Sequence, residues 1–260
     1  MFTKLREKIL SKEFLSSKIK RIIILDSVDS TNNYGQLLDR PLDGTIVIAN
    51  NQTNGKGRNG REWKSFNEKN IAISMILNYP KSNEHIGLTS ILTANSVIQT
   101  LEMLDFYPRV KWPNDILINS KKISGILSEA VFKNNKAKSL IIGVGINVNC
   151  SSSDFFEGSF DYRIDPTSMF LEKNCIFSRE DVIVSFLENF FKWVDEFKCK
   201  NFETILDFWL SRWDEIGKNI SIVKNGKKIN GNIYNVNTKG ELILQVDNKE
   251  IVINSGEILV

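Results

Sequence analysis

Glycines and cations alternate in one short stretch of this 260-residue chain, and the stretch ends in a tryptophan. It runs Gln52-Thr-Asn-Gly55-Lys56-Gly57-Arg58-Asn-Gly60-Arg61-Glu-Trp63. Glycine lets backbone N–H groups approach an anion closely, and arginine binds phosphate or carboxylate oxygens through paired N–H groups. An indole offers a flat face to a base. The stretch predicts an adenylate site; a solvated basic loop before a core tryptophan is the alternative.

This stretch is not a P-loop. Gly57 follows Lys56 where a P-loop has serine or threonine, and position 50 is Asn rather than Gly.

Three further segments contain residue types that could act on a nucleotide. Lys111-Trp-Pro-Asn114-Asp115 joins a cation to a carboxylate, which suits phosphate neutralisation, metal binding or lysine deprotonation, or only a surface ion pair. In Lys121-Lys122-Ile-Ser-Gly125-Ile-Leu, the glycine inside a strand indicates close approach by a ligand or another backbone. Gly143-Val-Gly145-Ile-Asn147 lacks the third glycine of a dinucleotide fingerprint, and its Asn147 either reads an adenine edge or forms a turn.

Histidine occurs once, as His85 in a His-Ile-Gly-Leu segment that we interpret as a helix start. A single histidine excludes a histidine-rich metal site, and because we interpret His85 as a helix-start residue we expect no serine-hydrolase triad.

The elements that must position these residues follow from hydrophobic periodicity. Helical spacing predicts a short amphipathic helix over 2–19, a long helix from Leu88 to Leu104, and helices near 179–198 and 202–213. Asp29-Ser30-Thr31-Asn32 supplies N-cap residues before another helix. Residues 51–66 and 151–163 are expected to be loops. Strands are expected at Ile22–Leu25, Thr45–Ala49, Asn70–Leu77, Arg109–Trp112, Asp115–Ile118, Ile123–Phe132 and Leu140–Asn149.

The pattern changes from Gly217, where short alternating segments are separated by turn pairs such as Asn225-Gly226 and Lys239-Gly240. This predicts a small all-β module that packs on the main domain. The irregular mixture of strands and helices before it indicates an α+β fold. We divide the chain into a main domain, 1–214, and a C-terminal domain, 215–260.

Composition excludes several classes of protein. Hydrophobic residues make up 42% and charged residues 25%, so disorder and fibrous repeats are excluded. Neither a membrane span nor an apolar signal segment is present, and three cysteines without CxxC spacing favour free thiols in a reducing, cytoplasmic compartment. Residues 1–21 hold seven basic and two acidic groups, which we interpret as a solvated helix face rather than a nucleic-acid arm.

Four units stand in one order along the chain: Asp29–Asn32, Gly55–Trp63, Lys111–Asp115 with Lys122–Leu127, and Gly143–Asn147. Together they resemble the biotin–protein ligases from about Leu25 to Asn149. The familiar bacterial loop has arginine where this chain has Lys56, which keeps the charge and loses the paired N–H groups.

The resemblance implies a mixed-sheet catalytic domain of the biotin/lipoate ligase type and an SH3-like C-terminal β-barrel. It implies that biotin and Mg²⁺·ATP give biotinyl-5′-AMP, and that the acyl group then passes to a lysine of a biotin carboxyl carrier domain. Some members add an N-terminal DNA-binding domain; only about 20 residues precede the first expected strand here, so we expect no nucleic-acid partner. A monomer or a homodimer is compatible with the family.

Residue roles are carried over by matching these motifs. The biotin set is Ser30, Thr31, Asn32, Gln52, Lys56, Gly57, Arg58, Lys122 and Gly125. The ATP and adenylate set is Arg58, Arg61, Trp63, Lys111, Asn114, Lys122 and Asn147. The catalytic set is Lys122, Arg58, Lys111 and Asp115, with Asp115 orienting the acceptor lysine; no metal ligands are assigned.

Two alternatives stay open. Attachment of lipoate or octanoate by the same fold would also use Lys122, but an aliphatic chain needs no polar partners such as Ser30, Thr31 and Gln52. A binding module or regulator without catalysis would use the basic N-terminus and would bind DNA in a salt-dependent way.

Overall fold

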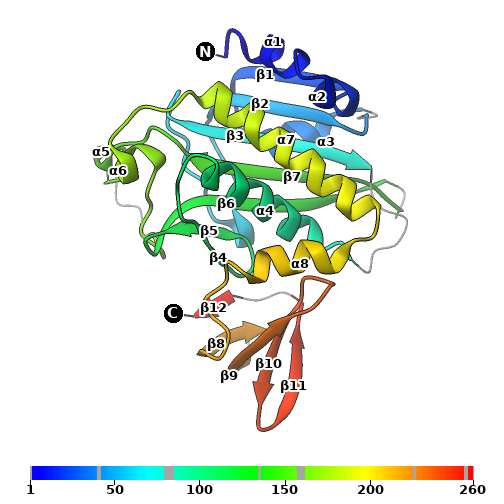
Figure 1. Ribbon diagram of the computed structural model, residues 1–260, viewed down its shortest axis with the longest axis vertical. Helices are drawn as coiled ribbons and strands as arrows, with labels where there is room; N and C mark the ends of the chain where they lie inside the picture. The colour runs from blue at the N-terminus through cyan, green and yellow to red at the C-terminus, as the bar shows by residue number, and fades with distance from the viewer. Residues whose placement is uncertain are drawn as a thin grey trace.

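The computed structural model describes residues 2–39, 42–78, 85–133, 136–156, 162–224, 227–254 and 257–259. Figure 1 shows a large sheet crossed by helices, with a smaller sheet beyond one end of it. No helix in the described ranges is long and apolar enough to cross a membrane.

The large sheet has seven strands in the order β1-β2-β3-β7-β6-β5-β4. Only β1 and β2 run parallel, and every other neighbouring pair is antiparallel, so the predicted mixed sheet is confirmed. The strands are β1 (Arg21–Val28), β2 (Thr45–Gln52), β3 (Asn70–Asn78), β4 (Arg109–Lys111), β5 (Asp115–Ile118), β6 (Lys121–Lys133) and β7 (Lys136–Asn147).

Three helices cover one face of this sheet: α4 (Leu88–Glu102), α7 (Arg179–Lys198) and α8 (Phe202–Leu210). Helix α4 is buried on nearly all sides because it packs on the sheet and is flanked by the other two helices. Even its Asn95 is buried, and the Nδ2 atom donates to the carbonyl oxygen of Ile205 over 2.8 Å. This packing forms the main hydrophobic core.

The opposite face is covered differently. Helix α3 (Thr31–Leu37) packs there on a small cluster of Val47, Ile76 and Ile141. Beyond that cluster, cross-strand register places Ala72, Gly145 and Gly125 side by side, with Ser74 and Gly143 in the adjacent row. Small side chains on three neighbouring strands leave space over the sheet, and the candidate site lies there.

The N-terminal residues form two helices, α1 (Leu5–Leu10) and α2 (Glu13–Lys18), and the single predicted helix over 2–19 is wrong. Ile9 and Leu15 are both fully buried. Six residues apart on a straight helix, they would point about 120° apart, so the break at Lys12 lets both reach the core.

The basic N-terminus pairs with α7. Ion pairs join Lys8 to Glu180 and Asp181, Lys12 to Glu188, and Lys18 to Asp195. These ion pairs place three of the basic side chains against α7, and the interpretation of the segment as a solvated helix face rather than a nucleic-acid arm stays a prediction.

Part of the predicted loop over 151–163 is also wrong, because α5 (Ser152–Phe156) lies within it. The Ser151 N and Oγ atoms both donate to the carboxylate of Asp154, a local capping arrangement that the Ser-x-x-Asp spacing could have indicated. Within that prediction, residues 157–161 lie outside the described residues, and residues 162–163 are in neither helix nor strand. Helix α6 (Met169–Lys173) follows.

The C-terminal module is a five-stranded antiparallel SH3-like sheet in the order β11-β10-β9-β8-β12. Its strands are β8 (Asn219–Lys224), β9 (Lys227–Val236), β10 (Leu242–Val246), β11 (Lys249–Ile253) and β12 (Glu257–Leu259). The predicted turn at Lys239-Gly240 is present, with Gly240 at φ +77°, whereas Asn225-Gly226 lies outside the described residues. The 214/215 boundary stays a prediction.

The turn between β9 and β10 contacts the main domain. The Gly240 carbonyl oxygen accepts from the indole Nε1 of Trp112 over 3.3 Å, and His85 Nδ1 lies 2.7 Å from the carbonyl oxygen of Thr238. The lone histidine therefore lies between the two domains rather than at a catalytic centre.

The cysteines differ in reactivity. Cys150 is buried, and burial raises the pKa of its thiol to about 12, whereas Cys175 and Cys199 are exposed. Since the thiolate is the reactive form, we expect Ellman's reagent at pH 8 to modify two thiols in the native protein and a third only after denaturation. Rapid modification of all three in the native protein would contradict this burial.

Candidate functional site

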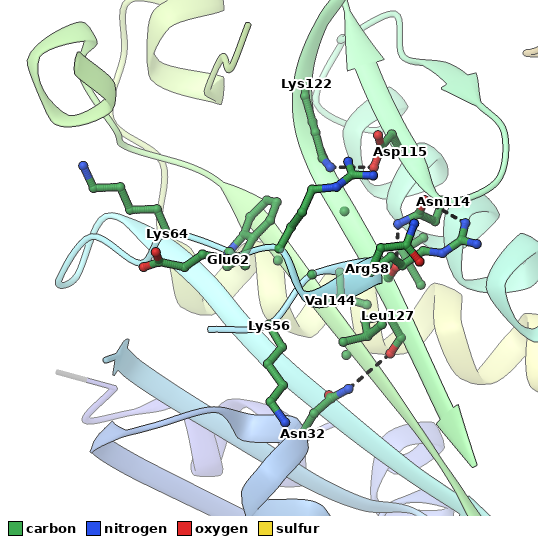
Figure 2. Close-up of a pocket in the computed structure, with 18 of the residues that line it drawn as sticks. Asn32, Lys56, Arg58, Glu62, Lys64, Asn114, Asp115, Lys122, Leu127 and Val144 are labelled. Carbon is green, nitrogen blue, oxygen red and sulfur yellow. Dashed lines mark hydrogen bonds and ion pairs between the residues drawn. The ribbon is translucent and has the colours of Figure 1, made fainter. Parts of the chain in front are cut away.

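A cavity of about 310 Å³ lies over the open face of the large sheet. It contains fourteen of the fifteen predicted site residues, namely Ser30, Thr31, Asn32, Gln52, Lys56, Gly57, Arg58, Arg61, Trp63, Lys111, Asn114, Asp115, Lys122 and Gly125. These residues are far apart in sequence, and the fold brings them to one cavity (Figure 2).

Two glycines form the floor of this cavity beneath Trp63. Gly125 and Gly145 lie directly opposite each other on β6 and β7, and the indole lies against both. A Cβ at Gly145 would come within 2.2 Å of the Trp63 ring, and one at Gly125 within 3.2 Å. The close approach predicted for Gly125 is thus present, and the approaching groups are Trp63 and the Lys122 side chain.

This contact yields a graded prediction. Gly145→Ala should displace the indole and raise the Kd for ATP about 30-fold, since a base–aromatic stacking contact contributes ~1–3 kcal/mol. Gly125→Ala, with its looser contact, should raise it only a few-fold. Calorimetric titration with ATP measures both, and a larger effect from Gly125→Ala would contradict the packing argument.

The glycine-rich loop folds back on itself as a short hairpin. Gly57 N donates to Arg61 O over 2.7 Å, and Trp63 N donates to Gly55 O over 2.8 Å. Its tip is a 3-10 turn (Arg58–Gly60) in which Asn59 has a left-handed φ of 57°. This closure aims Arg58 into the cavity, where its Nη1 atom lies 3.4 Å from Asn114 Oδ1.

Cations crowd one half of the cavity. Burial lowers the pKa of the Arg58 guanidinium, with Asp115 opposing the shift and Arg61 adding to it. Burial also lowers the pKa of Lys111, against the opposing effect of Glu215. Burial makes the protonated forms of these side chains less favourable, and a bound anion would stabilise them. This half of the cavity therefore suits phosphates.

Lys122 and Asp115 form an ion pair in the cavity, with Nζ and Oδ1 2.6 Å apart (Figure 2). The ammonium also lies 5.8 Å from the centre of the Trp63 ring. The Lys122 backbone is fixed from the far side, since its N donates to Asp165 O and its O accepts from Thr167 N. The Lys122 ammonium is therefore held in place where the half that is lined by cations meets the rest of the cavity.

The other half of the cavity is lined mainly by uncharged polar groups. Thr31 N and Oγ1 both donate to Gln52 Oε1, over 2.8 and 3.1 Å. Ser30 is the N-cap residue of α3, yet its side chain makes no capping bond. Lys56 extends toward Asn32 at this end (Figure 2). Such a set can hold a compact ligand with both donors and acceptors.

Asn147 is the predicted site residue that the fold does not bring into this cavity. Its side chain is buried, and Nδ2 donates to Thr167 O over 3.0 Å, so it supports the segment that holds Lys122. Its adenine-binding role stays a prediction.

Sequence reasoning missed Tyr162, Arg163 and Ile164, which also line the cavity. Burial and the neighbouring Arg61 lower the pKa of Arg163. The segment has no periodicity or motif that could have indicated this position, because only the tertiary fold returns it to β6.

Comparison with known proteins identifies the family. The model of the biotin/lipoate A/B protein ligase family matches residues 24–147. The bifunctional ligase/repressor BirA of Bacillus spizizenii is 32% identical over 233 residues, which cover 87% of this chain and 70% of that protein. The chain belongs to the biotin/lipoate A/B protein ligase family. The resemblance to biotin–protein ligases, and the expectation of an enzyme of that class, are confirmed.

Solved structures agree with this assignment. The biotin protein ligase of Aquifex aeolicus in complex with biotin and ATP matches with a TM-score of 0.78 and 28% identity, covering 93% of this chain and 98% of that one. Among curated relatives, the biotin–[acetyl-CoA-carboxylase] ligase of Paracoccus denitrificans is 25% identical and covers 90% of this chain and 98% of that protein. The match to BirA of Bacillus subtilis spans 62% of that protein's length.

Proposed function

We propose that this protein activates biotin with ATP and transfers it to a lysine of a biotin carboxyl carrier domain. In the first step a biotin carboxylate oxygen attacks the α-phosphorus, and pyrophosphate leaves. In the second the lysine amine attacks the acyl carbon, the bond to AMP breaks, and an amide forms. The observation that carries this proposal is one cavity in which an end lined mainly by uncharged polar side chains, Ser30, Thr31 and Gln52, joins an end lined by several cations.

Lys122 stands at the junction, where a carboxylate would meet an α-phosphate. We assign it to stabilise the negative charge that builds up there during attack, because a fixed cation in a partly dry site acts most strongly on developing charge. Arg58, Arg61 and Lys111 would neutralise the phosphates, and Trp63 would stack on adenine. Ser30, Thr31 and Gln52 would bind the ureido ring of biotin.

Asp115 is paired to Lys122 in this structure, and it would accept a hydrogen bond from the incoming lysine amine once the adenylate engages Lys122. A carboxylate there could take the proton that the amine loses. This assignment requires the ion pair to loosen between the two steps.

Mg²⁺ would arrive with the nucleotide. The described residues contain no cluster of three or more His, Cys, Asp or Glu side chains. Mg²⁺ commonly needs only phosphate oxygens, water and one or two carboxylates, which fits the two cavity carboxylates, Asp115 and Glu62. The ion would neutralise the phosphates beside the cations named above.

The test is pyrophosphate release by the purified chain with MgATP, with and without biotin, followed by transfer to a carrier domain. A carrier whose acceptor lysine is changed to arginine is the control, and mass spectrometry reads the modification. Biotin-dependent release and lysine-dependent transfer are expected. Pyrophosphate release with lipoate or octanoate but not with biotin would show that the acid activated is lipoate or octanoate, within the same fold. We place the reaction in a reducing, cytoplasmic compartment, consistent with three free cysteines.

A further inference from the structure

We propose that Glu129 and Ser74 are positioning residues that decide which atoms of the site donate and which accept toward the ureido group. Neither side chain lines the cavity; both act through Asn32. The inference rests on the proposed function, because it takes the ligand to be biotin.

The Asn32 side chain packs over three neighbouring strands of the large sheet. Ser74 of β3, Gly143 of β7 and Leu127 of β6 lie in one cross-strand row. The amide of Asn32 lies directly over the glycine, since a Cβ at Gly143 would come within 2.3 Å of Asn32 Oδ1. The side chain is 3% exposed, so its amide must find its partners within the protein.

The acceptors on one side fix the orientation of this amide. Asn32 Nδ2 donates to Glu129 Oε2 over 2.7 Å and to the carbonyl oxygen of Leu127 over 3.3 Å (Figure 2 shows the second bond). Carboxylate and carbonyl oxygens only accept, so the Nδ2 half must face them. Oδ1 is thereby turned to Ser74.

The orientation of the Asn32 amide then determines which groups donate hydrogen bonds at the polar end of the cavity. Ser74 Oγ lies 2.6 Å from Asn32 Oδ1 and 2.7 Å from Thr31 Oγ1, and its single proton is shared between these two acceptors. Because Ser74 is a donor here, the Thr31 proton goes to Gln52 Oε1, which also accepts from Thr31 N. The relay therefore runs from Glu129 through Asn32, Ser74 and Thr31 to Gln52.

Two groups remain available to a ligand, one as a hydrogen-bond acceptor and one as a donor. The Thr31 hydroxyl has committed its proton and offers a lone pair, while the Gln52 amide has committed its oxygen and offers Nε2. A cyclic urea presents the complement, an N–H donor beside a carbonyl acceptor. A cyclic guanidinium presents donors only, so the relay selects against it.

The experiment compares biotin with 2-iminobiotin, its guanidinium analogue, by calorimetry at pH 7. The unmodified protein should bind biotin at least about 100-fold more tightly, because a site built for a specific polarity leaves its own groups unpaired with the wrong ligand. Glu129→Gln can turn either half of its amide to Asn32. It should weaken biotin binding about tenfold and 2-iminobiotin binding less than about twofold, the Leu127 carbonyl limiting the loss.

A second variant and two controls make the result specific. Ser74→Ala breaks the relay at another point and should narrow the preference in the same way. Glu203→Gln removes the same charge from an exposed position on α8 and should leave both affinities unchanged. Melting temperatures within about 4 °C of the unmodified protein would show that the variants fold.

Outcomes separate the inference from the function. A smaller ratio between the affinities for biotin and 2-iminobiotin in both Glu129→Gln and Ser74→Ala supports the inference. Unchanged affinities, or equal weakening of both ligands, would overturn the relay while biotin binding by the unmodified protein leaves the function standing. No biotin binding by the unmodified protein would overturn the function itself, and with it the identity of the ligand.

Discussion

Lys122→Met should slow formation of biotinyl-5′-AMP about a thousandfold, the largest loss that we expect from one side chain. Removing a group that stabilises charge in the transition state commonly costs ~10²–10³ in rate, and a cation within a partly buried cavity belongs at the upper end. A thousandfold loss equals about 4 kcal/mol of activation free energy. The change also leaves the half-buried Asp115 carboxylate without its partner at 2.6 Å, so an unpaired negative charge would lie near the phosphates.

The neighbouring lysine supplies the control. Lys121 is exposed and precedes Lys122 on the same strand, so Lys121→Met removes the same charge from the surface and should keep the rate within about twofold. Pre-steady-state pyrophosphate release measures the first step for each variant, and calorimetry with biotin measures ground-state binding. A Lys122→Met protein that loses biotin affinity but keeps its rate at saturation would show that this lysine acts only in binding.

Much of the fold could be predicted because each strand has its own apolar signal. Asn70–Asn78 and Leu88–Glu102 were predicted within two residues at each end, since one alternates and the other repeats at helical spacing. The break at Lys12 could not be predicted, because the benefit of burying both Ile9 and Leu15 depends on the core that they meet. Local periodicity is the same for one helix or two.

The site residues could be predicted as a set but not as an arrangement. Motif spacing identified Gly125 and Gly145, yet only the register of β6 against β7 places them opposite each other under Trp63. Arg163 follows a segment without a motif, and it reaches the cavity because residues 165–167 pair with the backbone of Lys122. Such contacts link positions some 40 residues apart, which a local pattern does not encode.

Ser74 and Glu129 were missed for a related reason. Each is a polar residue in an apolar strand, and such a residue is as compatible with a solvated edge as with a buried network. Only the position of Asn32 over Gly143 distinguishes the two, since it gives both side chains a partner.

Arg58→Gly should still form the adenylate but should release it about 30-fold faster. The guanidinium enters the cavity from the tip of the loop, lies 3.4 Å from Asn114 Oδ1, and faces the carboxylate of Asp115. Placed there, it would cover the mixed anhydride, and excluding solvent protects such a reactive intermediate. Loss of a charge-assisted hydrogen bond costs ~1.5–3 kcal/mol, which corresponds to roughly 10- to 150-fold in dissociation. Released adenylate should label exposed lysines on any protein, measured by blotting a non-carrier protein for biotin.

Arg58→Gly has two effects, because it removes the guanidinium and makes the backbone of the loop more flexible. A second variant in the same loop separates these effects. Asn59 already has a left-handed φ of 57°, so Asn59→Gly adds a glycine beside Arg58 without straining the turn. If the guanidinium is what retains the adenylate, Asn59→Gly should retain it as the unmodified protein does, and Arg58→Lys should lie between the two. Indiscriminate labelling by Asn59→Gly as strong as that by Arg58→Gly would show that loop stiffness, and not the arginine side chain, holds the adenylate in place.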